Sequence, residues 1–244
     1  MSHNQSRRSF LEMAAAGAAS LALGGVPSAR AAGRLMFVNF ATYVEDRNKV
    51  NASRAEHQVY ADALRENGHL VTGGPILGDD GRPSGVLLIY SAASRQEAEN
   101  FVQRDPFVLQ GAIESYRLDE WTDVDSNAEL LAASLVAPER RAPASAGTGA
   151  MRTYVSHVKF TSDRSRHERA GSVHREYEKG LKAGGQLLMA GPFANGSGAM
   201  FIYRAKSKHE ATALLLKDPY LTEGVVGAHT LLEWRMFGLN QALL

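Results

Sequence analysis

The sequence predicts an α+β fold in which two ferredoxin-like βαββαβ repeats pack sheet to sheet within one chain. Three observations support this prediction. The second half of the chain aligns with the first through one short deletion, and both halves show the same order of strand-forming and helix-forming segments. A four-stranded sheet with helices on one face also needs a cover on its other face, and a second repeat supplies it.

The alignment of the two halves uses an offset of 117 residues up to a loop, where four residues are deleted, and an offset of 113 after it. Both sides of the deletion contain matched positions. The main pairs are His57 with His174, Tyr60 with Tyr177, Gly74-Pro75 with Gly191-Pro192, Asp105 with Asp218, and Trp121 with Trp234. One deletion across so many matches indicates an internal duplication.

Each half begins with a β-rich segment, followed by an amphipathic helix that ends near a glycine. The expected ranges are strands at 35–42 and 153–160, helices at 53–67 and 172–183, second strands at 70–72 and 187–190, and third strands at 86–90 and 200–203. A turn is expected at Gly73-Gly74-Pro75. Ser94 with Glu97, and Ser207 with Glu210, are capping boxes that open a second helix.

The ends of these repeats define the expected domain boundaries: repeats at 34–123 and 151–240, with a linker at 124–150 that is rich in Pro, Ala, Ser and Gly in its second half. Residues 1–31 resemble a twin-arginine signal peptide. Arg7-Arg8 precedes a short apolar stretch, and Ala29-Arg30-Ala31 has the small residues that a signal peptidase recognises. The sequence therefore predicts export to the periplasm or the cell exterior, without stable membrane insertion after processing.

Composition excludes several classes of protein. The chain has no cysteine, so disulfides, thiol catalysis and Cys-ligated metal centres are excluded. Cleavage after Ala31 would remove three arginines and one glutamate from the 27 basic and 26 acidic residues, leaving a net charge of −1. A nearly neutral chain without a basic run is not expected to bind nucleic acid.

The histidine pair and the aspartate pair are the candidate site. His57 and His174 lie on the apolar faces of their helices, so each imidazole needs a partner for its ring N–H. A carboxylate in that role fixes the tautomer and makes the other nitrogen a better base. The alternative for Asp105 and Asp218 is structural, because Asp-Pro is a common helix start with Asp as the N-cap. Both roles are compatible with one carboxylate.

The joint pattern resembles the YciI-related (YCII) domain family: an early Tyr/Phe-Val strand, a helix with an inward histidine, Gly-Pro after the second strand, and Asp-Pro before the last strand. Together the two repeats extend this resemblance over most of the chain. The resemblance implies a dimeric α+β barrel, formed here within one chain, and a His–Asp pair in a pocket. It also implies that Arg54, one turn before His57, contacts an anionic substrate. Gly171 stands at the matching position, so only the first site is expected to be complete.

We therefore expect a cofactor-independent enzyme, lyase-like or isomerase-like, that transfers protons on a small organic molecule, with His57 and Asp105, or His174 and Asp218, as the catalytic pair. Arg54, Tyr60 and Tyr177 are the expected substrate contacts, and the tyrosines have a core role as the alternative. A metal site formed by His157, His174 and His229 has no compact spacing to support it, and no metal or organic cofactor is expected. The competing hypothesis is a non-catalytic, small-ligand-binding or stress-related barrel. The duplication allows a monomer, or a further homo-oligomer.

Overall fold

The computed structural model describes residues 33–135 and 150–244 and contains two similar α+β halves. The expected signal peptide and much of the expected linker lie outside the described residues. The first half consists of β1 (Leu35–Tyr43), α2 (Arg47–Glu66), β2 (Leu70–Leu77), β3 (Pro83–Ala92), α3 (Arg95–Gln103), α4 (Pro106–Leu109) and β4 (Ile113–Trp121). The second half consists of β6 (Arg152–Phe160), α6 (Arg164–Ala183), β7 (Leu187–Pro192), β8 (Gly198–Ala205), α7 (Lys208–Leu216), α8 (Pro219–Thr222) and β9 (Val226–Trp234).

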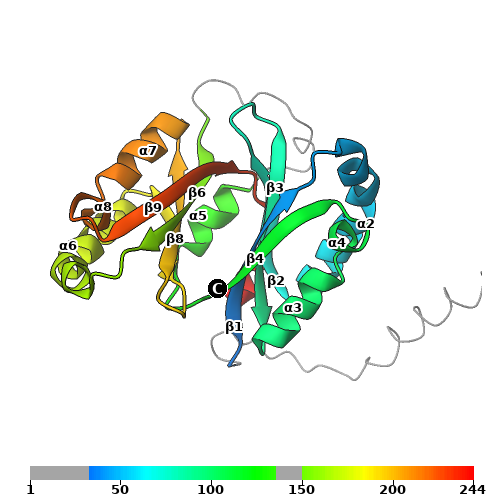
Figure 1. Ribbon diagram of the computed structural model, residues 1–244, viewed down its shortest axis with the longest axis horizontal. Coiled ribbons are helices and arrows are strands. Elements are labelled where there is room, and N and C mark those ends of the chain that lie inside the picture. The colour runs from blue at the N-terminus through cyan, green and yellow to red at the C-terminus, as the bar shows by residue number, and fades with distance from the viewer. Residues whose placement is uncertain (1–32, 136–149) are drawn as a thin grey trace, which may run out of the picture.

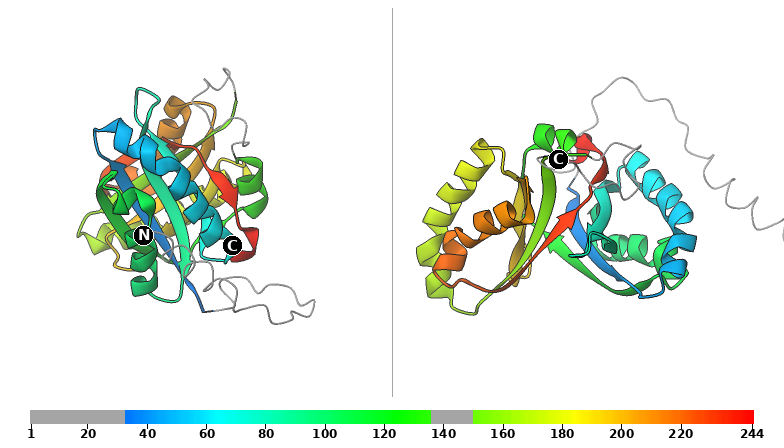
Figure 2. Two further views of the ribbon diagram at one scale, coloured as in Figure 1. Left: turned by 90° about the vertical axis from the view of Figure 1, so that its right-hand side faces the viewer. Right: turned by 90° about the horizontal axis from the view of Figure 1, so that it is seen from above.

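Both halves have the βαββαβ topology that the sequence predicts. The strand order is β4-β1-β3-β2 in the first half and β9-β6-β8-β7 in the second, and all pairs are antiparallel. The two sheets face each other, and the helices cover their outer faces (Figures 1 and 2). A short segment follows each half: β5 (Asp125–Ser126) and α5 (Ala128–Ala133) after the first, and β10 (Phe237–Leu239) and the 3-10 helix η3 (Gln241–Leu243) after the second.

The two sheets join on both sides. On one side β2 pairs with β9, where Ile76 lies opposite Trp234, and on the other side Trp121 forms a bridge with Phe193. Each tryptophan also donates its indole N–H across the junction, Trp234 to the carbonyl of Gly74 at 3.0 Å and Trp121 to that of Gly191 at 2.7 Å. These matched contacts close the barrel.

The glycines at these junctions have a steric role. A Cβ on Gly74 would lie 1.8 Å from the Arg235 carbonyl oxygen, and one on Gly191 would lie 2.7 Å from that of Thr122. Only glycine allows such a close approach of two backbones. The predicted turn at residues 73–75 was wrong, because β2 continues through this segment and remains paired with β3.

The core of the described residues contains three large apolar clusters, beside a small one formed by Ala170, Tyr220 and Val225. One large cluster contains residues of both repeats and fills the space between the sheets, including Ile89, Ile202 and both tryptophans. The other two lie between each sheet and its own helices. Successive strand residues alternate between these layers: Leu87 and Ile89 belong to the inner cluster, and Val86 and Leu88 belong to the outer one.

The two long helices begin earlier than predicted. Asp46 caps α2 by accepting from the N–H of Asn48 at 3.0 Å, and Asp163 caps α6 by accepting from that of Arg166 at 3.2 Å. The predicted starts at 53 and 172 were therefore wrong by six and eight residues. The predicted capping boxes are confirmed, since Ser94 and Ser207 accept from the N–H groups of Glu97 and Glu210.

Membrane crossing needs a long and apolar helix. No helix within residues 33–135 and 150–244 has both properties.

Candidate functional site

The first His–Asp pair lies between α2 and α4. The Nδ1 atom of His57 is 2.8 Å from Oδ1 and 2.9 Å from Oδ2 of Asp105. Oδ1 also accepts from the backbone N–H of Phe107 at 2.9 Å, so Asp105 is the N-cap of α4. One carboxylate therefore caps a helix and binds the imidazole. Both roles that the sequence left open for Asp105 are present at once. An ionised carboxylate only accepts, so Nδ1 carries the ring proton.

The second pair repeats this arrangement. Nδ1 of His174 lies 2.7 Å from Oδ1 of Asp218, and the same oxygen accepts from the N–H of Tyr220 at 2.8 Å. Both members are buried, with 6% of His174 and 1% of Asp218 exposed. The duplication has preserved the geometry of the pair as well as its residues.

An aromatic ring stacks on each imidazole. The His57 and Phe107 ring centroids are 4.0 Å apart at an interplanar angle of 23°, and those of His174 and Tyr220 are 3.7 Å apart at 11°. The stacked ring and the Nδ1 contact together fix the plane of the imidazole. The remaining nitrogen, Nε2, is the only hydrogen-bonding atom of each ring left for another partner.

The first site opens on a cavity of about 120 Å³ between α2 and the outer face of β2 and β3. Its charged lining groups are Arg54, Asp62 and Arg65, and Arg65 is paired with Asp62 at 2.5 Å. The apolar lining residues include Tyr43, Val86, Leu88, Phe107 and Phe237. Burial is the main cause that raises the pKa of Tyr43, and it outweighs the nearby Arg54, which lowers this pKa, so the hydroxyl remains protonated. None of the described residues engages Nε2 of His57 by a hydrogen bond or an ion pair.

The second site opens on a larger cavity of about 360 Å³. Here Oε2 of Glu178 lies 3.4 Å from Nε2 of His174, so both ring nitrogens face carboxylates. Glu178 aligns with Ala61 of the first repeat, which explains why the first site lacks this contact. Burial has the largest effect on the pKa of Glu178 and raises it, and His174, which has the next largest effect, lowers it.

The second cavity has an arginine of its own. Arg175 lines this cavity, although Gly171 stands at the position that matches Arg54. A Cβ on Gly171 would lie 3.4 Å from Nη1 of Arg175 and 3.6 Å from the Tyr220 hydroxyl, so the guanidinium lies beside the position that Arg54 holds in the first repeat. The repeats thus place an arginine at two different helix positions, 54 and 175. Aligning Gln58 with Arg175, and Ala61 with Glu178, is the sequence signal that would have found these residues.

The two candidate tyrosines do not line the cavities. The hydroxyl of Tyr60 donates to the Phe101 carbonyl at 2.8 Å, and that of Tyr177 to the Leu214 carbonyl at 2.7 Å. Each therefore joins a long helix to the following short one, and burial raises the pKa of Tyr60 to about 12. This geometry corresponds to the core role, not to a substrate contact.

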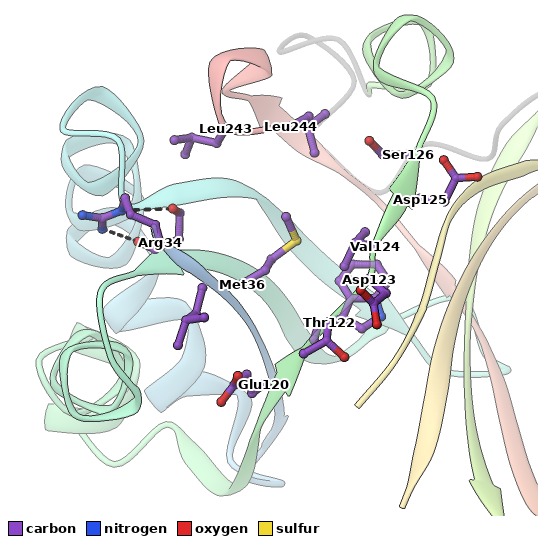
Figure 3. A pocket seen from close by; sticks show the side chains of 13 residues that line it. Arg34, Met36, Glu120, Thr122, Asp123, Val124, Asp125, Ser126, Leu243 and Leu244 are labelled. Atoms are coloured by element: carbon purple, nitrogen blue, oxygen red, sulfur yellow. Dashed lines mark hydrogen bonds between the residues drawn. The ribbon is translucent and has the colours of Figure 1, made fainter. Parts of the chain in front are cut away.

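The other polar groups do not form a comparable site. The described residues contain no cluster of three or more His, Asp or Glu side chains arranged to hold a metal ion. A further cavity of about 420 Å³ lies at the start of β1 and the end of β4 (Figure 3). Its only arginine, Arg34, is occupied by Ser91 and by His69, at 2.7 Å from the His69 Nδ1.

Comparison with known proteins identifies the repeat. The family model of the YCII-related domain matches residues 35–122 and again residues 152–235. No curated protein matches the chain.

Solved structures that cover most of this chain with a TM-score above 0.5 show the same fold. An anthrone oxidase-like protein shares 13% identity, with 87% of this chain and 94% of that chain covered and a TM-score of 0.51. A mutant chlorite dismutase from Candidatus Nitrospira defluvii shares 10% identity over 82% and 90% of the chains, with a TM-score of 0.52. The 5-chloro-2-hydroxyhydroquinone dehydrochlorinase from Burkholderia phenoliruptrix shares 28% identity over 36% of this chain and 94% of its own, with a TM-score of 0.33.

Proposed function

The chain belongs to the YCII-related domain family, with two copies in tandem, and from this premise we propose that it is a cofactor-independent enzyme. It transfers protons on a small organic molecule, in an elimination or an isomerisation. The observation that carries the proposal is His57, whose Nδ1 is bound to Asp105 and whose Nε2 has no partner among the described residues, at the wall of a cavity.

In this proposal His57 is the general base. Nε2 takes a proton from an acidic C–H or a phenolic O–H of the substrate, and the electron pair released forms a double bond. In an elimination this expels a leaving group, and in an isomerisation the proton returns at another atom. Asp105 stabilises the imidazolium that forms, and general base catalysis of this kind contributes about 10²- to 10⁴-fold in rate.

The cavity favours a small, flat, anionic substrate. Phe107, Leu88 and Val86 supply an apolar wall, and Arg54 supplies a positive charge that complements a phenolate or enolate oxygen. Arg54 donates to Asn51 at 3.2 Å on the exposed side of α2, so its guanidinium can turn to a ligand at little cost. A volume of about 120 Å³ limits the ligand to about one ring.

Hydrogen–deuterium exchange tests this proposal without knowledge of the net reaction. The protein is incubated in D₂O with a panel of phenols, hydroxyquinols and lactones, and carbon-bound deuterium is followed by NMR. We expect exchange that is lost in the double variant His57→Gln/His174→Gln. It is retained in the control His209→Gln, which changes an exposed histidine. Exchange that survives in the double variant would refute the proposal.

The alternative function is a ligand-binding protein in which the pairs are structural. Its support is that each aspartate also caps a helix and each imidazole is stacked on a ring. Under this alternative, members of the panel bind in the cavity without any exchange. Asp105→Asn and Asp218→Asn then change thermal stability alone.

We also propose that the protein is exported through the twin-arginine pathway. The support is the order of Arg7-Arg8, an apolar stretch and Ala29-Arg30-Ala31 in the sequence. Replacing both arginines by lysine should retain the protein in the cytoplasm with its leader uncleaved, as followed by fractionation and mass spectrometry. Unchanged processing of this variant would contradict the proposal.

A further inference from the structure

The second site differs from the first at the nitrogen that would act on a substrate. In the first site Nε2 of His57 has no described partner, and in the second Nε2 of His174 faces Oε2 of Glu178 at 3.4 Å. The imidazole of His174 thus lies in a row of three groups, Asp218–His174–Glu178. His174 has 8% of its side chain exposed and Glu178 25%, so water screens the row only in part.

The charges on these groups show how many protons the row must hold, because Nε2 of His174 and Oε2 of Glu178 lie at ion-pair distance and do not form a direct hydrogen bond. Nδ1 faces the acceptor Asp218, so Nδ1 carries a proton. If Glu178 is ionised, a favourable contact needs a second proton on Nε2. If Nε2 is unprotonated, the contact needs a proton on Glu178. In both cases one proton is held between His174 and Glu178, and this proton has no counterpart in the first site.

We propose that the second cavity is a general-acid site, in which Glu178 and His174 share a proton and donate it to a bound ligand. The inference deepens the proposed proton-transfer function by assigning opposite roles to the repeats, acid for the second and base for the first. Glu178 lies on the wall of the cavity, and His174 is the positioning residue, whose Nδ1 binds Asp218 and whose Nε2 faces Glu178.

The charges around Glu178 are consistent with proton retention. Burial raises its pKa most, the nearby Asp218 and Asp125 raise it further, and His174 and Arg175 lower it. Asp125 is itself paired with Lys182, which weakens its effect. The other titratable groups that line the cavity are Asp123, His167 and Tyr220.

The ligand class follows from the same groups. A proton donor beside Arg175 suits a ligand that is an anion and becomes neutral, such as an enolate or a phenolate. The electron pair on the ligand carbon or oxygen takes the proton, which leaves Glu178 as a carboxylate beside an unprotonated Nε2. Uptake of one proton from water restores the acid. Phe160, Phe201 and Tyr220 give the cavity aromatic walls for such a ligand.

The duplication supplies matched variants for the test. Glu178→Ala gives the second site the residue of the first repeat, and Ala61→Glu gives the first site the residue of the second. Glu176→Gln is the control, since this carboxylate lies two residues away with 75% of its side chain exposed. The readout is the ¹⁵N signals of the two histidine rings and the ¹³C signal of the Glu178 carboxyl, recorded against pH without any ligand.

We expect the shared proton in the wild type and in Glu176→Gln, seen as a ¹⁵N shift of His174 Nε2 and a ¹³C shift of Glu178 that change over one common pH range. Glu178→Ala should abolish the shift at Nε2, and Ala61→Glu should create one at His57. An Nε2 signal that is the same in the wild type and in Glu178→Ala would overturn the inference. Because no substrate is used, this result is separate from failure of the deuterium exchange assay.

Discussion

The two repeats share a scaffold and differ in the cavity beside it. In both, a helix histidine binds an aspartate that caps the next helix, and an aromatic ring stacks on the imidazole. The differences lie one turn away along the long helix, where Ala61 of the first repeat corresponds to Glu178 of the second. Duplication thus preserved the groups that hold the imidazole and varied those that meet a ligand.

A second difference comes from the segments after the last strand of each half. Phe237, which follows β9, lines the first cavity, whereas Asp123 and Asp125, which follow β4, line the second. Each site is therefore completed by the segment that leaves the other repeat. One cavity receives an apolar group and the other receives carboxylates, so the two sites suit different ligands or opposite steps of one reaction.

The largest expected effect tests the symmetry of the scaffold. Trp121→Ala and Trp234→Ala each remove a fully buried side chain and an indole hydrogen bond at a barrel junction. We expect each to lower the free energy of unfolding by about 3–5 kcal/mol, measured by urea denaturation. The control Trp→Phe at either position keeps an aromatic ring and should cost much less. If one alanine variant lost much more unfolding free energy than the other, the two junctions would not be equivalent, because only one of them would then be essential.

Much of this scaffold was predictable from the sequence, because local chemistry determines it. The strand order, the capping boxes and the His–Asp alignment depend on residues close together or on self-comparison of the chain. Gly73 and Gly74 suggested a turn, but glycine is needed there because Leu88 and Arg235 lie too close to leave room for a Cβ. Phe237 and Asp123 also line the cavities, and this was not predictable because each lies far in the sequence from the histidine of its cavity.

The next expected effect separates the two roles of the aspartates. Asp105→Ala and Asp218→Ala remove a helix cap and a charged hydrogen bond to the imidazole, so each should cost about 2–4 kcal/mol of unfolding free energy. The Asn variants should cost about half as much, because an amide oxygen still caps the helix. Equal losses in the Ala and Asn variants, measured by urea denaturation, would show that the cap contributes little.

A pH effect should distinguish the repeats. His157 stacks on Phe193 and aligns with Phe40 of the first repeat. Burial, followed by the charge of Arg117, lowers the pKa of His157 from 6.5 to about 4. The unfolded chain therefore binds the proton more readily, and stability falls as the pH drops from about 6.5 towards 4.

We expect His157→Phe to remove this acid-sensitive part of the stability, about 1–2 kcal/mol for a ring that stays partly in contact with water. Thermal unfolding at a series of pH values measures it, with exposed His209→Gln as the control. An identical pH profile for the wild type and His157→Phe would mean that another group causes the acid sensitivity.

The smallest expected effect concerns the two arginines and sharpens the comparison of the cavities. Arg54→Gln and Arg175→Gln each remove one partly solvated charge, worth about 1 kcal/mol, and should weaken the binding of benzoate about fivefold at the altered site. Binding of neutral benzamide should not change. Two-dimensional NMR resolves the sites through the backbone signals of Phe107 and Tyr220, which line the first and second cavities.

The double variant Gly171→Arg/Arg175→Gln gives the second helix the arrangement of the first. A Cβ at position 171 would make only ordinary van der Waals contacts, at 3.4 Å and 3.6 Å from its nearest neighbours, and one of these belongs to Arg175, which the variant replaces. If the two arginines are equivalent, this variant should bind benzoate at the second site as the wild type does. If binding stays as weak as in Arg175→Gln alone, the position of the arginine on the helix is itself selective, because Glu178 lies beside position 175 and not beside position 171.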